Sequence, residues 1–339
     1  MKIVLDCFGG DNAPKEAVIG GINALSENKE LSLVLSGDEK KIRSIIEENF
    51  GNIPERIEFL DAPEVIENED DPISAVRKKK NSSLIAGLYK IAQGEGDAFV
   101  SAGNTGAVFT GATLIIKRIK GIKRGALAPL IPTLKGKGVI IDVGANAECK
   151  SEYYPQFAIM GSVYAKEVLE IQNPKVGLIN IGVEHHKGTT VVKEAYKLLE
   201  NEKNIDFLGN IEARDVLKGD ANVLVSDGWT GNIAVKTVEG TASAFMHILK
   251  EAFYTNIFTK LAALILKPHI KNALKQFDSK ETGGALIAGL RAPVIKAHGN
   301  SDRTAFKNAV LFAHKCAERN ICKRIEELLP KEEENTTEE

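Results

Sequence analysis

The chain has 339 residues, 43% of them apolar and 27% charged, which is typical of a globular protein with a sizeable core. Its 44 lysines and arginines are balanced by 46 aspartates and glutamates, so no excess of positive charge favours nucleic-acid binding. No stretch approaches 18 uninterrupted apolar residues, and the four cysteines form no CxxC pair. We therefore expect no transmembrane helix and a cytoplasmic protein with reduced thiols.

One unit recurs along the chain: a short apolar run, a loop rich in Gly, Asn or Asp, and an amphipathic stretch. The loops of these units span residues 7–14, 101–106, 143–151, 182–188 and 226–232, and further strands are predicted at 31–38 and 56–63. Continuous Val/Ile/Leu runs predict strands buried on both faces, and the intervening helices predict parallel pairing. We therefore expect a layered α/β fold with the loops converging on one cleft at the carboxyl ends of the strands.

No Pro/Ser-rich linker divides the chain, so residues 1–328 are predicted to form a single α/β domain, with two lobes as an alternative. An amphipathic helical segment is expected at 250–278. The polar, acidic residues 329–339 are expected to be a disordered tail.

Residues 101–107 read SAGNTGA and lie between a predicted strand and a predicted helix. Gly103 and Gly106 permit close approach of a ligand to the backbone, and the free amides that open the next helix favour an anion. A tight turn with Asn104 or Thr105 as helix cap explains the same residues without a ligand. The motif alone leaves both interpretations open.

Two other strand ends, DVGAN (142–146) and SDGWTGN (226–232), have the same character. Asp142 has no second acid at metal-ligand spacing, so a structural hydrogen-bonding role is favoured and no metal site is predicted. Asn232 either caps the following helix or donates its amide to a substrate oxygen. Trp229 is interpreted as wall or core.

Two strand-end loops carry histidine or lysine beside glycine. In GVEHHKG (182–188) the paired histidines do not form HExxH, but Lys187 can act as a point charge for phosphate or an oxyanion, or can simply be solvated. In IKAHGNSD (295–302), His298 is a general acid or base, or a satisfied core histidine.

Basic and amphipathic segments offer surfaces for partners. The runs Arg77, Lys78, Lys79 and Lys80, and 117–124, are solvated faces or docking sites for an acidic protein. In 253–277, apolar residues at helical spacing alternate with lysines and Pro268 is predicted to break the run; the apolar face includes Ile257, Leu261, Leu264 and Ile265. Periodicity alone favours core packing or a dimer contact over a membrane interface.

Taken in order, these motifs resemble those of the bacterial phosphate acyltransferases of phospholipid synthesis, the PlsX family. The resemblance covers about residues 2 to 325 and rests on DCFGGDNAP, AVRKKKNSS, SAGNTGA, RIKGI, DVGAN, QFAIMGSVYA, NIGVEHHKG, SDGWTGNIAVKTVEG and APVIKAHGNSD. Two departures are small: Cys7-Phe8 replaces the usual Ala-Met, and ETGGALIAGL varies a Tyr-Gly-Gly segment. Neither departure removes a polar group that we assign to catalysis.

The resemblance implies a reaction without cofactor: reversible transfer of a long-chain acyl group from acyl carrier protein to inorganic phosphate, which gives an acyl phosphate. A membrane acyltransferase then uses this product to acylate glycerol 3-phosphate. The implied fold is a Rossmann-like αβα arrangement, similar to that of isocitrate and isopropylmalate dehydrogenases and phosphotransacetylase. The family forms homodimers that associate peripherally with the membrane, through the lysine-rich helices.

By the same resemblance, Lys187 and Asn232 are the catalytic residues. Residues expected to bind phosphate or substrate are Gly103, Asn104, Thr105, Gly106, Asp142, Asn146, Asp227, Thr230, Gly231 and His298. The sequence has neither a GxSxG elbow nor a predicted Ser–His–Asp triad, which fits phosphate as the direct nucleophile. The alternatives are a coenzyme A-dependent phosphotransacetylase, a nicotinamide-dependent dehydrogenase, and a non-catalytic membrane scaffold.

Overall fold

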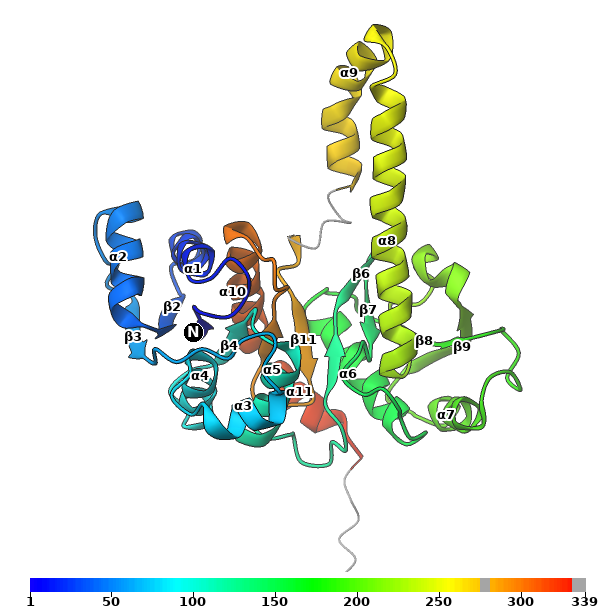
Figure 1. Ribbon diagram of the computed structural model, residues 1–339. Coiled ribbons are helices and arrows are strands. Elements are labelled where there is room, and N and C mark those ends of the chain that lie inside the picture. Colours follow the sequence, from blue (N-terminus) through cyan, green and yellow to red (C-terminus); the bar gives the residue numbers. More distant parts are fainter. Residues whose placement is uncertain (275–280, 331–339) are drawn as a thin grey trace, which may run out of the picture.

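The computed structural model describes residues 1–274 and 281–330, and two sheets organise them (Figure 1). The larger sheet has seven strands in the order β3-β2-β1-β4-β12-β11-β5. Its strands are β1 (Lys2–Asp6), β2 (Ser32–Gly37), β3 (Ile57–Asp61), β4 (Ala98–Ser101), β5 (Ala126–Ala128), β11 (Ala285–Ala288) and β12 (Val294–Lys296). All neighbours pair in parallel except β11, which is antiparallel to both β12 and β5.

The smaller sheet has five strands in the order β6-β7-β10-β8-β9. They are β6 (Leu130–Thr133), β7 (Gly136–Ile141), β8 (Lys175–Asn180), β9 (Asp206–Glu212) and β10 (Val223–Val225). Only β6 runs antiparallel to its neighbour. The mostly parallel α/β architecture expected from the sequence is confirmed, with two sheets carrying it.

Helices connect the strands and cover the sheets. They are α1 (Lys15–Glu27), α2 (Glu39–Phe50), α3 (Pro72–Lys78), α4 (Ser83–Ala92), α5 (Thr105–Ile115), α6 (Tyr153–Glu167), α7 (Thr190–Glu200), α8 (Gly228–Phe253), α9 (Ile257–Leu274), α10 (Arg303–Glu318) and α11 (Ile321–Leu328), with a 3₁₀ turn at Ala213–Lys218. One apolar cluster contains Leu5 and Val100 from the larger sheet and Val139 and Val225 from the smaller. The two sheets therefore share a core.

The strand order brings distant segments of the chain together. Strand β12 pairs with β4 so that Lys296 lies opposite Ser101, which places the segment after Val294 beside the SAGNTGA loop. In the smaller sheet β10 lies between β7 and β8, so the 226–232 loop meets the 142–146 loop. Each sheet therefore contributes a pair of adjacent strand-end loops.

Helices α8 and α9 form a hairpin that projects from the smaller sheet (Figure 1). The prediction that Pro268 breaks the run was wrong: the turn lies at 254–256, and Pro268 is inside α9. The prediction of core packing was also wrong, because Ile257, Leu261, Leu264 and Ile265 are 57–72% exposed. Of the segment expected at 250–278, residues 275–278 lie outside the described residues, as do residues 331–339 of the expected tail.

Candidate active site

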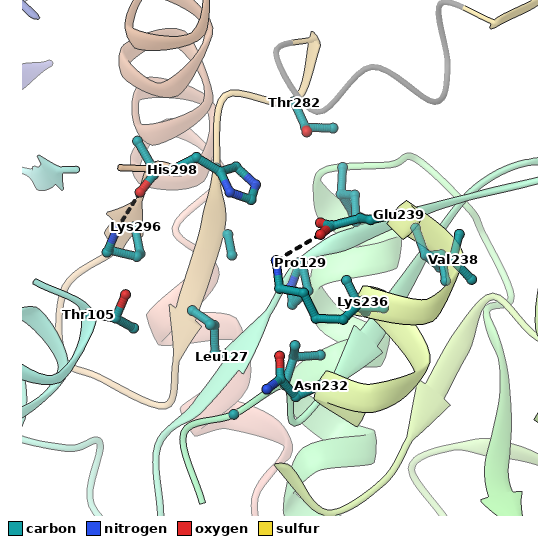
Figure 2. Close-up of a pocket in the computed structure, with 18 of the residues that line it drawn as sticks. Thr105, Leu127, Pro129, Asn232, Lys236, Val238, Glu239, Thr282, Lys296 and His298 are labelled. Atoms are coloured by element: carbon teal, nitrogen blue, oxygen red, sulfur yellow. Dashed lines mark hydrogen bonds and ion pairs between the residues drawn. The ribbon is translucent and has the colours of Figure 1, made fainter. Parts of the chain in front are cut away.

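A cavity of about 380 Å³ lies between the two sheets. Figure 2 shows Thr105, Lys296 and His298 on one side of it and Asn232, Lys236 and Glu239 of α8 on the other. Its walls are mainly apolar and include Leu127, Pro129, Leu130, Ile131, Pro132, Val143, Val235, Val238, Ala242 and Ala285. The cavity thus has polar groups from both sheets beside an apolar surface, as expected of a small-molecule site.

The SAGNTGA loop forms one edge of the cavity. The Asn104 side chain accepts a hydrogen bond from the Ala107 backbone N–H (3.0 Å) and donates to the Asn68 carbonyl (2.9 Å), so both its polar atoms are occupied. Asn104 is therefore the helix cap, one of the two caps that the sequence offered. The Thr105 side chain, at the first turn of α5, lines the cavity.

A buried carboxylate supports this loop, and we assigned it no role from the sequence. Asp6 accepts hydrogen bonds from Ser101 Oγ (2.6 Å) and Ser83 Oγ (2.7 Å), and Ser101 Oγ in turn accepts from the Gly103 N–H (3.0 Å). Burial raises the pKa of Asp6, while the two hydroxyl groups oppose that shift. This chain of hydrogen bonds fixes the backbone just before the α5 N-terminus.

Across the cavity, the DVGAN loop is held by its own carboxylate. Asp142 accepts from the Leu127 N–H (2.8 Å), the Asn146 N–H (2.7 Å) and the Asn146 amide (3.0 Å). Burial raises the pKa of Asp142. Neither Asp142 nor Asn146 lines the cavity, so the structure gives both a supporting position, as the hydrogen-bonding interpretation of Asp142 expected.

The start of α8 packs tightly on this loop. Asp227 caps the helix by accepting from the Thr230 N–H (2.7 Å) and Thr230 Oγ1 (3.0 Å). A Cβ at Gly231 would overlap the Asp142 carbonyl oxygen, so only glycine permits this approach. Asp227, Thr230 and Gly231 therefore position α8 and do not line the cavity.

Asn232 lines the cavity from the second turn of α8 and lies against Gly144. The interpretation of Asn232 as a helix cap was wrong, because α8 begins at Gly228 and Asp227 caps it. Within the described part of the chain the Asn232 side chain makes no hydrogen bond. Its amide is therefore available to a ligand.

Lys187 is not brought to the cavity. It lies in the loop after β8, half-buried, with its aliphatic stem beside Gly182. The loop is tied down where the Asn180 amide donates to the Lys187 carbonyl (3.1 Å). Because β8 neighbours β10 in the sheet, Lys187 is on the same sheet edge as Asn232, but outside the cavity wall.

His298 and Lys296 lie at the end of β12. His298 is exposed, so it is not a core histidine, but partial desolvation at the cavity lowers the pKa of its ring, which is mainly uncharged near neutral pH. Burial lowers the pKa of Lys296 to about 8. From the sequence we assigned Lys296 no role. The only pattern that could have indicated one is its position at the end of an apolar run and directly before Ala-His-Gly.

The four basic residues expected to dock an acidic protein differ in whether they form an ion pair. Lys79 donates to Asp70 (2.6 Å) and to the Val65 carbonyl (2.8 Å), whereas Arg77, Lys78 and Lys80 are exposed.

In the described residues no group of three or more His, Cys, Asp or Glu side chains is placed to hold a metal ion. None of the helices in residues 1–274 and 281–330 is long and apolar enough to cross a membrane.

Comparisons with known proteins agree with this architecture. A family model described as "Fatty acid synthesis protein" matches residues 1–324. The chain is 47% identical to the phosphate acyltransferase of Clostridium tetani over 97% of this chain and 98% of the relative. It is 46% identical to that of Geobacillus thermodenitrificans over 95% and 96%.

Solved structures share the fold at low sequence identity. A phosphotransacetylase from Streptococcus pyogenes has a TM-score of 0.62 and 19% identity, covering 94% of each chain. A branched-chain phosphotransacylase from Enterococcus faecalis has a TM-score of 0.58 and 13% identity, covering 94% of this chain and 99% of that one. This likeness supports the two-sheet architecture.

Proposed function

The chain belongs to the phosphate acyltransferase family, and we propose that its cavity transfers a long-chain acyl group from acyl carrier protein to inorganic phosphate. It is an acyltransferase with phosphate as acceptor. The observation that carries the finer proposal is the pairing of a helix N-terminus with an unpartnered amide, Asn232, across a largely apolar cavity.

The reaction needs no protein nucleophile. An oxygen of HPO₄²⁻ attacks the thioester carbonyl, the C–O bond forms and the C–S bond breaks. The proton carried by the phosphate ends on the departing thiolate, which gives acyl phosphate and free thiol. Inorganic phosphate loses its second proton near pH 7, about one unit above the monoester value of about 6, so about half of it is dianionic at neutral pH. A leaving thiol with a pKa of about 8.5 departs readily.

We assign these two tasks, phosphate binding and stabilisation of the oxyanion, to opposite walls of the cavity. Phosphate is proposed to bind at the first turn of α5, where Thr105 faces the cavity and free backbone amides favour an anion. Gly103, Asn104 and Gly106 shape that turn. Asn232 is proposed to donate its amide to the oxyanion that develops on the thioester carbonyl. The apolar wall formed by Leu127, Ile131 and Val238 suits the start of the acyl chain.

The hairpin extends the proposal to a membrane surface on the cytoplasmic side. Exposed apolar side chains on both helices suit peripheral insertion. They are Phe245, Met246, Ile248, Ile257, Phe258, Leu261, Leu264, Ile265 and Leu266. We also propose that the protein is a homodimer and delivers its product to a membrane glycerol 3-phosphate acyltransferase. Measuring the molecular mass of the protein in solution without lipid tests whether a second copy covers the apolar surface of the hairpin.

The decisive experiment supplies the purified chain with phosphate and one of two acyl donors, long-chain acyl-acyl carrier protein or acetyl-coenzyme A. The acyl phosphate formed is trapped as its hydroxamate. We expect turnover with long-chain acyl-acyl carrier protein and little with acetyl-coenzyme A. The reverse preference would favour a coenzyme A-dependent phosphotransacetylase. Absence of turnover with either donor would favour the scaffold.

A further inference from the structure

We propose that Lys296 binds the phosphate substrate directly, donating its remaining N–H from the cavity wall to a phosphate oxygen. This inference rests on the proposed function and adds a residue to it. The ordinary role of a buried lysine is to pair with a carboxylate, so the first question is whether Lys296 has such a partner.

The Lys296 ammonium is buried without an ion pair. Its side chain donates to the Ala102 carbonyl (3.3 Å) and to the Ala297 carbonyl, and no carboxylate lies within ion-pair distance of it in the described residues. The nearby Asp6 has its oxygens occupied by Ser83 and Ser101. An ammonium has three donors, so one remains available after the two carbonyls.

The position of this donor matches the proposed phosphate site. Lys296 lines the cavity together with Thr105 and His298, and it is only 8% exposed. Its contact with the Ala102 carbonyl ties it to the loop that leads into α5. The ammonium at the end of β12 and the positive end of α5, which follows the neighbouring strand β4, therefore face the same space, and an anion there would interact with both.

The burial of the Lys296 ammonium explains why it favours binding of an anion. Removing an ammonium from water is costly unless an anion accompanies it, and the lowered pKa of Lys296, about 8, reflects that cost. A bound phosphate dianion restores the missing negative charge and stabilises the ammonium. Uncompensated buried charge of this kind is characteristic of functional sites.

The same balance predicts a pH dependence of phosphate binding. The charged groups that face Lys296 are Asp6 and Asp11, and both raise its pKa. His298 also lies beside Lys296, and its lowered pKa means that its ring adds little positive charge near neutral pH. Phosphate must be a dianion and Lys296 protonated, so affinity should rise towards about pH 7 as inorganic phosphate loses its second proton, about one unit above the monoester value of about 6. It should fall as pH passes through about 8, where free Lys296 loses its proton.

The test is the Michaelis constant for inorganic phosphate in wild type, Lys296→Met and Lys296→Arg, at a saturating concentration of long-chain acyl-acyl carrier protein from pH 6 to 9.5. We expect Lys296→Met to raise this constant about 10- to 100-fold, the range for a lost charged hydrogen bond. The weakening above pH 8 should disappear in both variants, because methionine is never charged and arginine always is. A structural role alone would not remove it.

The matched control is Lys90→Met. Lys90 of α4 is also largely buried, with its side chain 12% exposed, but it pairs with Glu95 (2.8 Å) and lies outside the cavity. Its phosphate constant should equal that of wild type. Thermal unfolding of every variant shows which are folded. If Lys296→Met does not fold, the pH dependence of the phosphate constant in Lys296→Arg tests the assignment of Lys296.

An unchanged phosphate constant in folded Lys296→Met, or an alkaline weakening that persists in Lys296→Arg, would overturn the inference and leave the proposed function intact. If wild type shows no turnover, the proposed function fails first. Calorimetric titration of wild type and Lys296→Met with inorganic phosphate then tests Lys296 alone: binding lost only in the variant supports the assignment, and equal binding refutes it.

Discussion

The two ends of α8 present opposite environments. At its start, Gly228 and Gly231 pack against the DVGAN loop, Asp227 caps the helix and Asn232 lines the cavity. Towards its end, Phe245 and Ile248 are more than 60% exposed and belong to none of the apolar clusters formed by the described residues. One helix therefore joins a tightly positioned site to an uncovered apolar surface.

This contrast predicts that chemistry and surface binding are separable. Because the first turns are fixed by backbone contacts to the smaller sheet, changes in the hairpin should not move Asn232. Conversely, changes at Asn232 leave the exposed side chains in place. The following variants test that separation, from the largest expected effect to the smallest.

Asn232→Ala should lower turnover about 10²- to 10³-fold, the usual cost of removing one oxyanion donor. Asn232→Asp should do the same, because its carboxylate has the same shape but cannot donate a hydrogen bond. Hydroxamate trapping measures turnover, and liposome flotation should be unchanged in both variants. Wild-type activity in either folded variant would remove Asn232 from the mechanism.

Lys187→Ala is predicted to lower turnover on the same scale, although its side chain does not line the cavity. Such a loss, with phosphate binding retained, would indicate that the 182–188 loop closes on the bound donor. Lys193→Ala, an exposed lysine on the neighbouring α7, is the control and should be silent. Full activity of Lys187→Ala would contradict a catalytic role.

Replacing Leu261 and Leu264 with glutamate should weaken liposome association about 100-fold, since two apolar side chains lose a favourable environment. Turnover of soluble acyl carrier protein substrate should stay within about twofold of wild type, because neither residue lines the cavity. Leu134→Glu, an 80% exposed leucine outside the hairpin, is the control and should float with liposomes normally. Undiminished flotation of the double variant would refute the membrane assignment.

Charge reversal of Arg77 and Lys78 should raise the Michaelis constant for acyl-acyl carrier protein a few-fold at low salt and little at high salt, because salt screens exposed charges. Turnover at saturation should not change. Reversal of Lys117 and Lys120 in the other basic run is the comparison. If only the second pair has the effect, the docking surface is that run.

The sequence predicted what local patterns determine. Buried apolar runs predicted β1 to β4 of the larger sheet and β7, β8 and β10 of the smaller, but they did not single out β5, β6, β9 or β11. The cap of α5 is Asn104, one of the two neighbouring residues that the sequence left as candidates. Pro268 was misjudged because an internal proline removes one helical hydrogen bond and destabilises a helix without always ending it. The exposure of Leu261 and Leu264 was misjudged because helical periodicity describes an apolar face without saying what covers it.

The site itself depends on strand order, which local patterns do not contain. Lys296 is unremarkable in sequence because a lysine at a strand end is usually solvated; its burial follows from β12 pairing beside β4. Asp6 likewise meets Ser83 and Ser101 only through tertiary structure. The arrangement of Asn232 and Lys187 around the cavity equally requires the order β7-β10-β8.

The length of α8 sets a spatial limit on what happens to the product. Its 26 residues rise about 39 Å at ~1.5 Å per residue, so a hairpin resting on lipid holds the cavity within that distance of the surface. An acyl phosphate is a mixed anhydride that water destroys, and its fatty tail partitions into lipid. If the hairpin rests on lipid as proposed, this short distance favours capture of the acyl phosphate by the bilayer over its hydrolysis, and the length of α8 then limits how long the product is exposed to water.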